Sequence, residues 1–337
     1  MIPDAELPHG VHPLKMPMPS DALVPDSTLE YTLCYLLQTE EGWGLIDTGW
    51  NHEAGMQAFL KRLQALRLKP VDIRWILVTH FHPDHIGLAQ RIKEISRARV
   101  VMHVQDSPST FRARLQAVGR SFTQRFEEWL RSQGMPAVAT ASIPMMRNPP
   151  ASFLPDLDVD VQVEGDADLS PSLKLIWTPG HTPGHLCLHD TRRRLLFSGD
   201  QVLPGITTNV SLFPLGPDNP LGDYLASLHR LETIEVEWVL PAHEHPFKGL
   251  RTRLGELERH HTSRLEETLS TLKGGPRTAY QVARQVGWSP GPWDSMSPSN
   301  RLMALFETLA HLRYLVRHGT VEEVKQNSVV VYALRAG

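Results

Sequence analysis

Short runs of mainly apolar residues recur along the chain, and most of them are closed by glycine, proline or acidic residues. Runs of four to nine residues with this punctuation are typical of β-strands that are buried in a core. The chain therefore contains many short strands and a β-rich core. The predicted strands cover residues 31–39, 43–47, 73–79, 99–102, 173–178, 185–190, 194–200 and 237–240.

Between these runs, apolar residues recur at the spacing of one helix face. In residues 53–66 the apolar positions are Met56, Phe59, Leu60, Leu63 and Leu66. The same spacing predicts helices over 86–95 and 220–233. The predicted strand at 73–79, the helix at 86–95 and the strand at 99–102 form a β-loop-α-β unit, so the fold class is α/β.

Two predicted hairpins, over 31–47 and 173–200, both end on an aspartate, Asp47 and Asp200. This weak internal repeat predicts two similar β-rich halves that face each other. Residues 107–150 do not fit the repeat, because they contain two short helices, over 108–118 and 120–133, and a loop rich in proline and methionine. We expect this insertion to form a lid or a substrate wall, with the apolar side chains Phe111, Phe122, Phe126, Trp129, Met145 and Met146 facing a pocket or lying in the core.

Beyond residue 250 the pattern changes to a long polar helix to about residue 272, two shorter helices near 277–286 and 299–317, and a hairpin around Gln326 and Asn327. The order helix, helix, hairpin is that of a winged helix. We therefore predict a first domain over residues 1–250 and a second, winged-helix-like domain over 251–337.

Charge and composition narrow the classes of function. The 337 residues carry a formal net charge of −3, which gives no overall basic field to attract nucleic acid. The first residues, MIPDAELPHG, do not resemble a signal peptide, and no run of 18 apolar residues occurs, so we expect a cytoplasmic protein that is not bound to a membrane. The two cysteines, Cys34 and Cys187, do not suffice for a cysteine-rich metal site.

The 17 histidines are the unusual feature of the composition, and three of them occur in VTHFHPDHIG, residues 78–87. Neutral imidazole and carboxylate groups are ligands of zinc and similar metals, and a loop at a strand end lets residues two apart converge. His80 and His82 suit one metal ion, whereas Asp84 and His85, at the start of the next helix, suit a second. Further histidines follow other predicted strands, as in TPGHTPGH (residues 178–185) and PAHEHP (241–246).

These motifs resemble those of the metallo-β-lactamase superfamily, over about residues 15 to 250. The resemblance is closest to the branch of glyoxalase II and beta-lactamase-like protein 2, and it implies a four-layer αββα sandwich. It also implies that His80, His82 and His185 bind one metal ion, that Asp84, His85 and His243 bind another, and that Asp200 bridges them. The choice of His185 over His181 comes from the resemblance, since spacing alone does not decide. Asp47 would orient a ligand, and Asp84 could also relay a proton.

The resemblance implies two Zn²⁺ ions, with iron or manganese equally suited to these ligands, and a bridging hydroxide as the nucleophile. We predict hydrolysis of a small ester, thioester or lactone. The first alternative is a ribonuclease or phosphodiesterase acting on single-stranded nucleic acid, because the C-terminal region resembles that of a branch with such an enzyme. The second is a metal-stabilised binding module without activity. A homodimer is possible through the C-terminal region, and His245 either lines the site or caps a turn.

Overall fold

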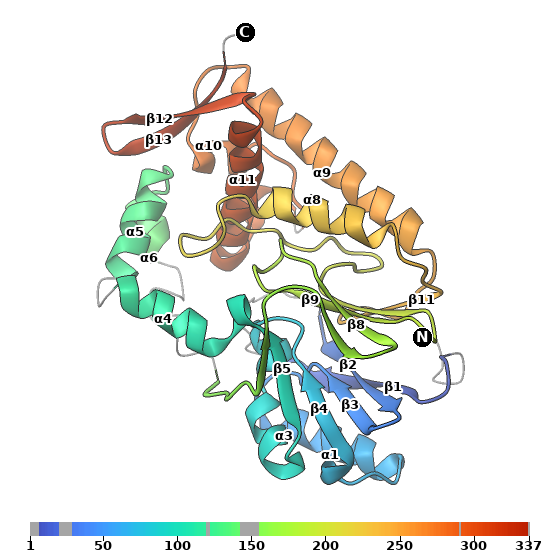
Figure 1. The fold of residues 1–337 in the computed structure, drawn as a ribbon. Coiled ribbons are helices and arrows are strands. Elements are labelled where there is room, and N and C mark those ends of the chain that lie inside the picture. The colour runs from blue at the N-terminus through green and yellow to red at the C-terminus, as the bar shows by residue number, and fades with distance from the viewer. Residues whose placement is uncertain (1–6, 20–28, 119–121, 142–154, 290, 336–337) are drawn as a thin grey trace.

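A computed structural model describes residues 7–19, 29–118, 122–141, 155–289 and 291–335 of the chain (Figure 1). The first of its two large sheets has the order β1-β2-β3-β4-β5-β6. In this sheet β1, β2 and β3 are antiparallel, whereas β3 to β6 run parallel. The strands are β1 (Val11–Pro17), β2 (Tyr31–Thr39), β3 (Gly42–Ile46), β4 (Ile73–Leu77), β5 (Arg99–His103) and β6 (Val161–Val163).

The second sheet has the order β11-β10-β9-β8-β7, and only the pair β10 and β11 is parallel. Its strands are β7 (Ala167–Ser170), β8 (Leu173–Trp177), β9 (Leu186–Asp190), β10 (Leu195–Gly199) and β11 (Trp238–Pro241). Alternate residues of the central strands point to opposite faces, as a strand requires. In β2, for example, Leu33, Tyr35 and Leu37 belong to the cluster shared by the two sheets, whereas Cys34 and Leu36 face away from it.

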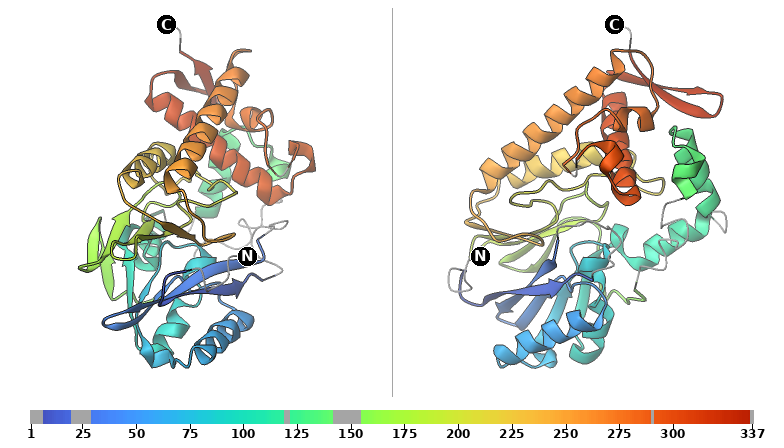
Figure 2. Two further views of the ribbon diagram at one scale, coloured as in Figure 1. Left: turned by 90° about the vertical axis from the view of Figure 1, so that its right-hand side faces the viewer. Right: turned by 180° about the vertical axis from the view of Figure 1, so that it is seen from behind.

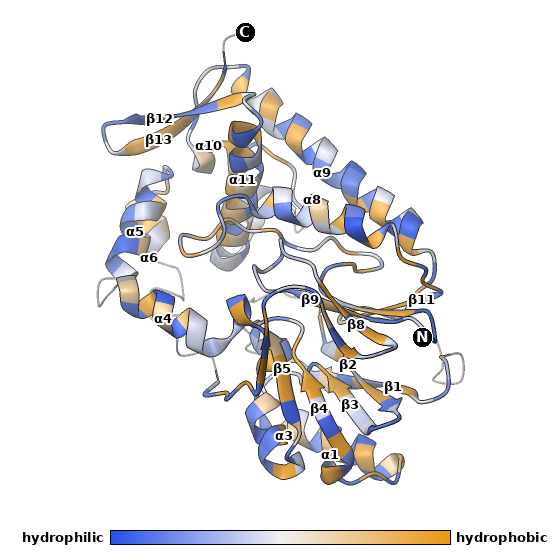
Figure 3. Ribbon diagram, in the orientation of Figure 1, coloured by the Kyte–Doolittle hydropathy of each residue, from blue (hydrophilic) through white to orange (hydrophobic). Residues whose placement is uncertain are grey.

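Helices cover the outer face of each sheet. The helices α1 (Glu53–Ala65) and α3 (Ala89–Ser96) pack on the first sheet, and α8 (Pro220–Leu231) and α9 (Leu250–Leu272) pack on the second (Figures 1 and 2). Figure 3 shows the apolar residues concentrated on the strands between these layers. The arrangement confirms the predicted α/β fold, a four-layer αββα sandwich. No helix in the described ranges has the length and apolar character needed to cross a bilayer.

The predicted central strands and long helices are present, but β1, β6 and β7 were not predicted. β1 contains Pro13, Lys15 and Pro17, yet all seven of its residues pair with β2. Proline is tolerated on an edge strand because one side of the strand needs no donor. The lack of a hydrophobic run in β1 therefore reflects its place at the sheet edge.

The helix predicted over 86–95 is divided into α2 (Pro83–Ile86) and α3. A Cβ atom on Gly87 would lie 2.5 Å from the backbone nitrogen of Asn51 and 2.7 Å from the carbonyl oxygen of Gly49. The loop after β3 thus packs directly on the backbone at this position. Leu88 donates a backbone hydrogen bond of 3.2 Å to Gly49, which fixes the break.

The predicted insertion contains α4 (Pro108–Val118), α5 (Phe122–Ser132) and α6 (Ala137–Ala141), and Met145 and Met146 lie outside the described residues. Phe126 and Leu130 of α5 are buried in one cluster with the C-terminal region. Gln133 strengthens this contact, because its side chain accepts a hydrogen bond from the Tyr332 hydroxyl and its carbonyl accepts one from the amide of Tyr280.

The C-terminal region has the predicted order, with α10 (Ala279–Ala283), α11 (Pro298–Arg317) and the hairpin of β12 (Val321–Gln326) and β13 (Val329–Leu334). Both α8 and α9 contact α11, so this region is joined to the sandwich along the second sheet's helical layer. The boundary at residue 250 and the winged-helix identity stay predictions.

Candidate metal centre

The candidate ligands all follow strand ends, and the strands deliver them to one edge of the two sheets. In open α/β sheets, ligand sites form where the carboxyl ends of strands meet loops. The first sheet supplies Asp47 after β3 and the histidine motif after β4, and the second supplies the 178–185 loop before β9, Asp200 after β10 and His243 after β11.

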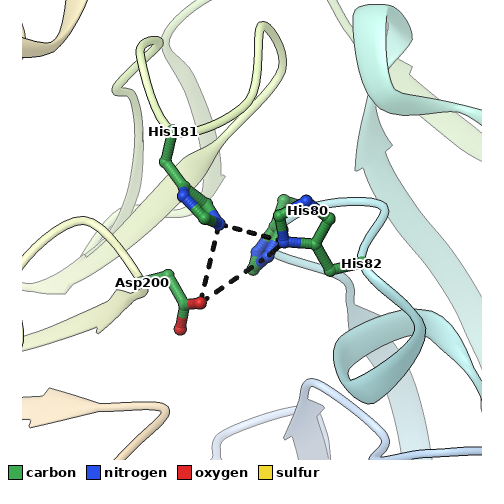
Figure 4. A group of neighbouring side chains, drawn as sticks. All are labelled: His80, His82, His181 and Asp200. Atoms are coloured by element: carbon green, nitrogen blue, oxygen red, sulfur yellow. Dashed lines mark hydrogen bonds and ion pairs between the residues drawn. The ribbon is translucent and has the colours of Figure 1, made fainter. Parts of the chain in front are cut away.

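The first group contains three histidines and one aspartate, His80, His82, His181 and Asp200 (Figure 4). One ligand atom from each lies within 4.8 Å of the others. His82 Nδ1 is 3.0 Å from both His80 Nε2 and His181 Nε2, and His181 Nε2 is 3.6 Å from Asp200 Oδ2. Three imidazole nitrogens and a carboxylate oxygen therefore face a common point.

The second group consists of Asp84, His85 and His243. Asp84 Oδ2 lies 3.4 Å from the Nε2 atoms of both histidines. The other oxygen of Asp200, Oδ1, is 3.5 Å from His85 Nε2 and 3.3 Å from His243 Nε2. Asp200 therefore turns one oxygen toward each group and lies between them.

The structure does not bring His185 into the first group. Its Nε2 accepts a hydrogen bond of 3.2 Å from the backbone amide of Asp200, and its Nδ1 is 2.8 Å from Thr178 Oγ1. Both ring nitrogens are thus used within the protein, beneath the turn that carries Asp200. We therefore propose His181 in place of His185 in the candidate ligand set, whereas the resemblance seen in the sequence implied His185.

Unpaired buried atoms show that these residues fit metal ions. Within the described part of the chain, His85 Nε2 and Asp200 Oδ1 are buried without a hydrogen-bond partner. Leaving such atoms unpaired costs free energy, on the order of 1 to 3 kcal/mol for each group. A cation between them would satisfy both, and neutral imidazoles with carboxylates are the donors that zinc-type ions take.

Burial and neighbouring charges give the two groups different proton affinities. Burial lowers the pKa of His82 to about 3 and that of His80 well below its usual value. In the second group burial also opposes the charged form, but Asp200 and Asp84 outweigh it and raise the pKa of His243 to about 10. The first group therefore holds imidazoles in the neutral form that binds metal. The second holds carboxylates that attract a cation.

Asp47 lies behind the second group and does not face the common point. Its Oδ2 is 2.8 Å from His85 Nδ1, and its Oδ1 accepts a hydrogen bond of 2.8 Å from the amide of Thr79. Asp47 is 1% exposed. A carboxylate on one ring nitrogen fixes the tautomer and directs the other nitrogen toward the metal. The contacts of Asp47 with His85 and Thr79 are those that such a positioning role requires.

Asp106 is a functional candidate that the sequence analysis missed. It is buried, and it accepts hydrogen bonds from the Gly184 amide (2.7 Å) and the Thr182 hydroxyl. It therefore anchors the loop that carries His181. Burial raises the pKa of Asp106 to about 7 against the opposing effect of these donors. Its place four residues after the strand predicted over 99–102, at the same sheet edge as the histidine motif, was a usable signal.

The remaining histidines lie outside both groups. His245 is exposed and lines a cavity of about 530 Å³ beside β1 and α1, so it is not among the candidate ligands. His103 stacks on Trp177, with ring centroids 5.2 Å apart. His261 and His311 are buried and lie 3.2 Å apart through ring nitrogens, which makes them structural.

Comparisons with known proteins support these observations. A probable metallo-hydrolase of Bacillus subtilis (strain 168) is 24% identical over 293 residues, which span 86% of this chain and 89% of the relative. A beta-lactamase-like protein 2 homolog of Caenorhabditis elegans is 26% identical, covering 88% and 82% of the two chains. A crystal structure of a metallo-beta-lactamase family protein from Thermus thermophilus has a TM-score of 0.77 and 28% identity, covering 97% of this chain and 99% of that chain.

Two relatives with more specific names match shorter stretches. An N-acyl homoserine lactonase of Bacillus cereus is 27% identical over 191 residues, or 50% of this chain and 62% of the relative. A bovine acyl-coenzyme A thioesterase is 39% identical over 98 residues, which are 28% of this chain and 32% of the relative.

The family profile described as the Metallo-beta-lactamase superfamily matches residues 27–243, which include all the candidate ligands. The match confirms the family predicted from the sequence, and with it a hydrolase that uses divalent metal ions. By its fold, its paired groups of histidine and aspartate and this match, the chain belongs to the metallo-β-lactamase superfamily.

Proposed function

We propose that this protein hydrolyses a small ester, thioester or lactone at a pair of zinc ions. His80, His82 and His181 would hold one ion, Asp84, His85 and His243 the other, and Asp200 both. The observation that carries the proposal is the position of Asp200, whose two oxygens point to different groups. Zinc suits these ligands, and iron or manganese are the other ions to test.

Two bound divalent ions supply an activated water nucleophile and polarise the acyl oxygen of the substrate. The protein's own residues prepare this chemistry. Asp47 holds His85 by its Nδ1 atom, and Asp106 holds the loop of His181. Asp84 Oδ2 accepts a hydrogen bond of 3.1 Å from Thr32 Oγ1. We propose that Asp84 also accepts the proton released by the nucleophile and returns it to the leaving group.

Aromatic side chains beside the first group support an acyl substrate. Phe81 lies within the histidine motif, with its ring centroid 4.9 Å from that of His82 and 5.5 Å from that of Phe111. We propose that these rings contact the apolar part of the substrate. Phe126, in contrast, is 2% exposed and packs in the core, as expected for aromatic residues at helical spacing. The names of the lactonase and thioesterase relatives point to the same substrate class.

The nuclease alternative loses support in the C-terminal region. Arg313 lies near Asp218 and Glu323 (3.7 and 3.3 Å), and Arg317 lies 3.3 Å from Asp218. Arg301 donates to the backbone carbonyls of Trp293 and Asp294. These arginines are engaged within the protein, whereas a phosphate-binding surface needs cations that can contact the backbone of the nucleic acid.

Metal analysis combined with a substrate panel tests the proposal. After zinc supplementation we expect about two zinc ions per chain by elemental analysis. A lactone, a thioester or a simple ester should be cleaved faster than a phosphodiester or a β-lactam, and cleavage should stop on chelation. Well under one metal ion per chain would overturn the proposed centre. Preferred phosphodiester cleavage would overturn the substrate class.

A further inference from the structure

The candidate ligand His181 is connected to the C-terminal region through the segment after β10. His181 Nδ1 lies 2.8 Å from the carbonyl oxygen of Asn209. A carbonyl only accepts, so Nδ1 carries the hydrogen and Nε2 keeps its lone pair for the first group. The position of the Asn209 backbone thus determines both the tautomer and the direction of His181.

Asn209 is in turn held by helix α11. Its side-chain amide donates a hydrogen bond of 3.2 Å to Glu307 Oε2, and its side-chain oxygen accepts one from Ser211 Oγ. Three residues further along the segment, the amide of Leu212 donates a hydrogen bond of 3.1 Å to the carbonyl of Phe306. Two successive residues of α11 therefore fix the segment that holds His181.

Glu307 does not form a close ion pair with a neighbouring cation. Its side chain is only 14% exposed, and the nearest cation is Arg264, whose Nε lies 4.0 Å from Oε1. Arg264 directs Nη1 instead to the carbonyl of Gly287 and to Glu267. Among the described residues, Asn209 is the hydrogen-bond donor to the Glu307 carboxylate.

Aromatic packing reinforces the same connection. Phe213 follows Leu212, and its ring lies 5.7 Å from Phe306 of α11 and 5.4 Å from Phe126 of α5, between ring centroids. The segment is therefore packed between the insertion and the C-terminal region. Both elements stand outside the repeated sandwich, yet both contact the segment that orients a candidate ligand.

We propose that Glu307 is a positioning residue for the metal centre, acting through Asn209 to orient His181. The inference rests on the proposed function, because it takes His181 as a ligand. The C-terminal region then contributes to metal affinity, because the Glu307 side chain holds the segment that links α11 to the first group. Residues that orient ligands in this way commonly change metal affinity by about 10- to 100-fold when removed.

Glu307→Ala and Glu307→Gln test the proposal as a pair. Alanine removes the acceptor for the Asn209 amide, whereas the glutamine carbonyl can replace it. We expect Glu307→Ala to weaken binding of one metal equivalent by about 10-fold in chelator competition, and to change the visible spectrum of the Co²⁺-loaded protein. Glu307→Gln should stay within about 3-fold of the parent protein on the same scale. Glu267→Ala, which removes the other carboxylate near Arg264, is the control and should leave affinity and spectrum unchanged.

A double-mutant cycle with Asn209→Ala separates this role from general stability. If Glu307 acts through Asn209, the double variant should bind metal no more weakly than the weaker single variant. Additive losses, or equal losses in the alanine and glutamine variants, would overturn the inference. If the parent protein binds two ions and Glu307→Ala binds them equally well, the inference about Glu307 is overturned and the proposed function is left intact. A parent protein without metal would instead overturn the proposed function.

Discussion

At the scale of single residues, the two histidines of the 178–185 loop have different proposed roles. His181 binds a metal ion, whereas His185 holds the turn that carries the ligand Asp200. His181→Ala removes a nitrogen from the first group, so we expect loss of about one metal equivalent and of hydrolysis. His185→Asn leaves the first group complete and disturbs the turn before Asp200, so we expect retained metal and an affinity lower by about 10-fold. Elemental analysis after dialysis, with chelator competition, measures both. Retained stoichiometry in His181→Ala with loss in His185→Asn would contradict the assignment.

Asp47 gives a second prediction at this scale. Asp47→Ala removes the carboxylate that holds His85 Nδ1 and the Thr79 amide. We expect affinity for one metal ion to fall by about 10- to 100-fold, while the circular dichroism of the protein stays near that of the parent. The matched control is Asp72→Ala, which removes an exposed carboxylate bonded to the Lys69 amide. Equal effects of the two substitutions would show that Asp47 does not act on the metal centre.

The candidate ligands differ in how much of their arrangement a local sequence motif expresses. The motif places His80, His82, Asp84 and His85 within six positions. One short loop therefore brings these side chains together without the help of distant segments. The choice between His181 and His185 depends on contacts over long sequence distances, such as those with Asn209 and with the Asp200 amide. A spacing pattern does not contain these contacts. Asp106 was missed although it follows a strand end, because a single aspartate at that place forms no motif with its neighbours.

At the scale of elements, the break between α2 and α3 depends on a missing side chain. In Gly87→Ala the new Cβ would meet the backbone of Asn51, Pro83 and Gly49 at 2.5 to 2.7 Å. Backbone cannot move aside cheaply, so we expect the free energy of unfolding to fall by about 1 to 3 kcal/mol. Urea denaturation of the metal-free protein measures this change.

Gly255→Ala in α9 is the matched control for Gly87, because a Cβ at that position meets no atom within 4 Å. Alanine favours a helix interior over glycine by about 0.5 to 1 kcal/mol, so this variant should be as stable as the parent or more stable. If Gly255→Ala lost as much stability as Gly87→Ala, the explanation that close packing at Gly87 excludes a Cβ atom would be wrong.

Element boundaries were predictable where burial makes the residue pattern regular. The central strands β2, β4, β9 and β10 are apolar because they lie between two layers. The edge strands β1, β6 and β7 face solvent on one side, and their sequences carry prolines or polar residues. The pairing of these edge strands depends on contacts with the rest of the sheet, and the local residue pattern does not predict such contacts.

At the scale of the whole molecule, the sandwich, the insertion and the C-terminal region meet around α11. Its residues Phe306 and Glu307 contact the segment that follows β10, and α5 packs on the same cluster. The predicted order of the C-terminal elements was correct. The order of helices and strands alone, however, does not predict that α11 packs on the helices α8 and α9 of the second sheet. The connection to the metal centre needed the three-dimensional contacts of Asn209.

A dependence of stability on pH follows from the buried carboxylate that makes this connection. Burial raises the pKa of Glu307 to about 7, whereas an unfolded glutamate ionises near pH 4.5. Between these values the folded state binds more protons than the unfolded state, so the stability that Glu307 contributes is complete at low pH and is lost as pH rises toward 7. Glu307→Gln stays neutral and avoids this loss. Relative to the parent, we expect the metal-free glutamine variant to gain about 1 to 3 kcal/mol between pH 4.5 and 8 in urea denaturation, and a constant difference across that range would contradict the prediction.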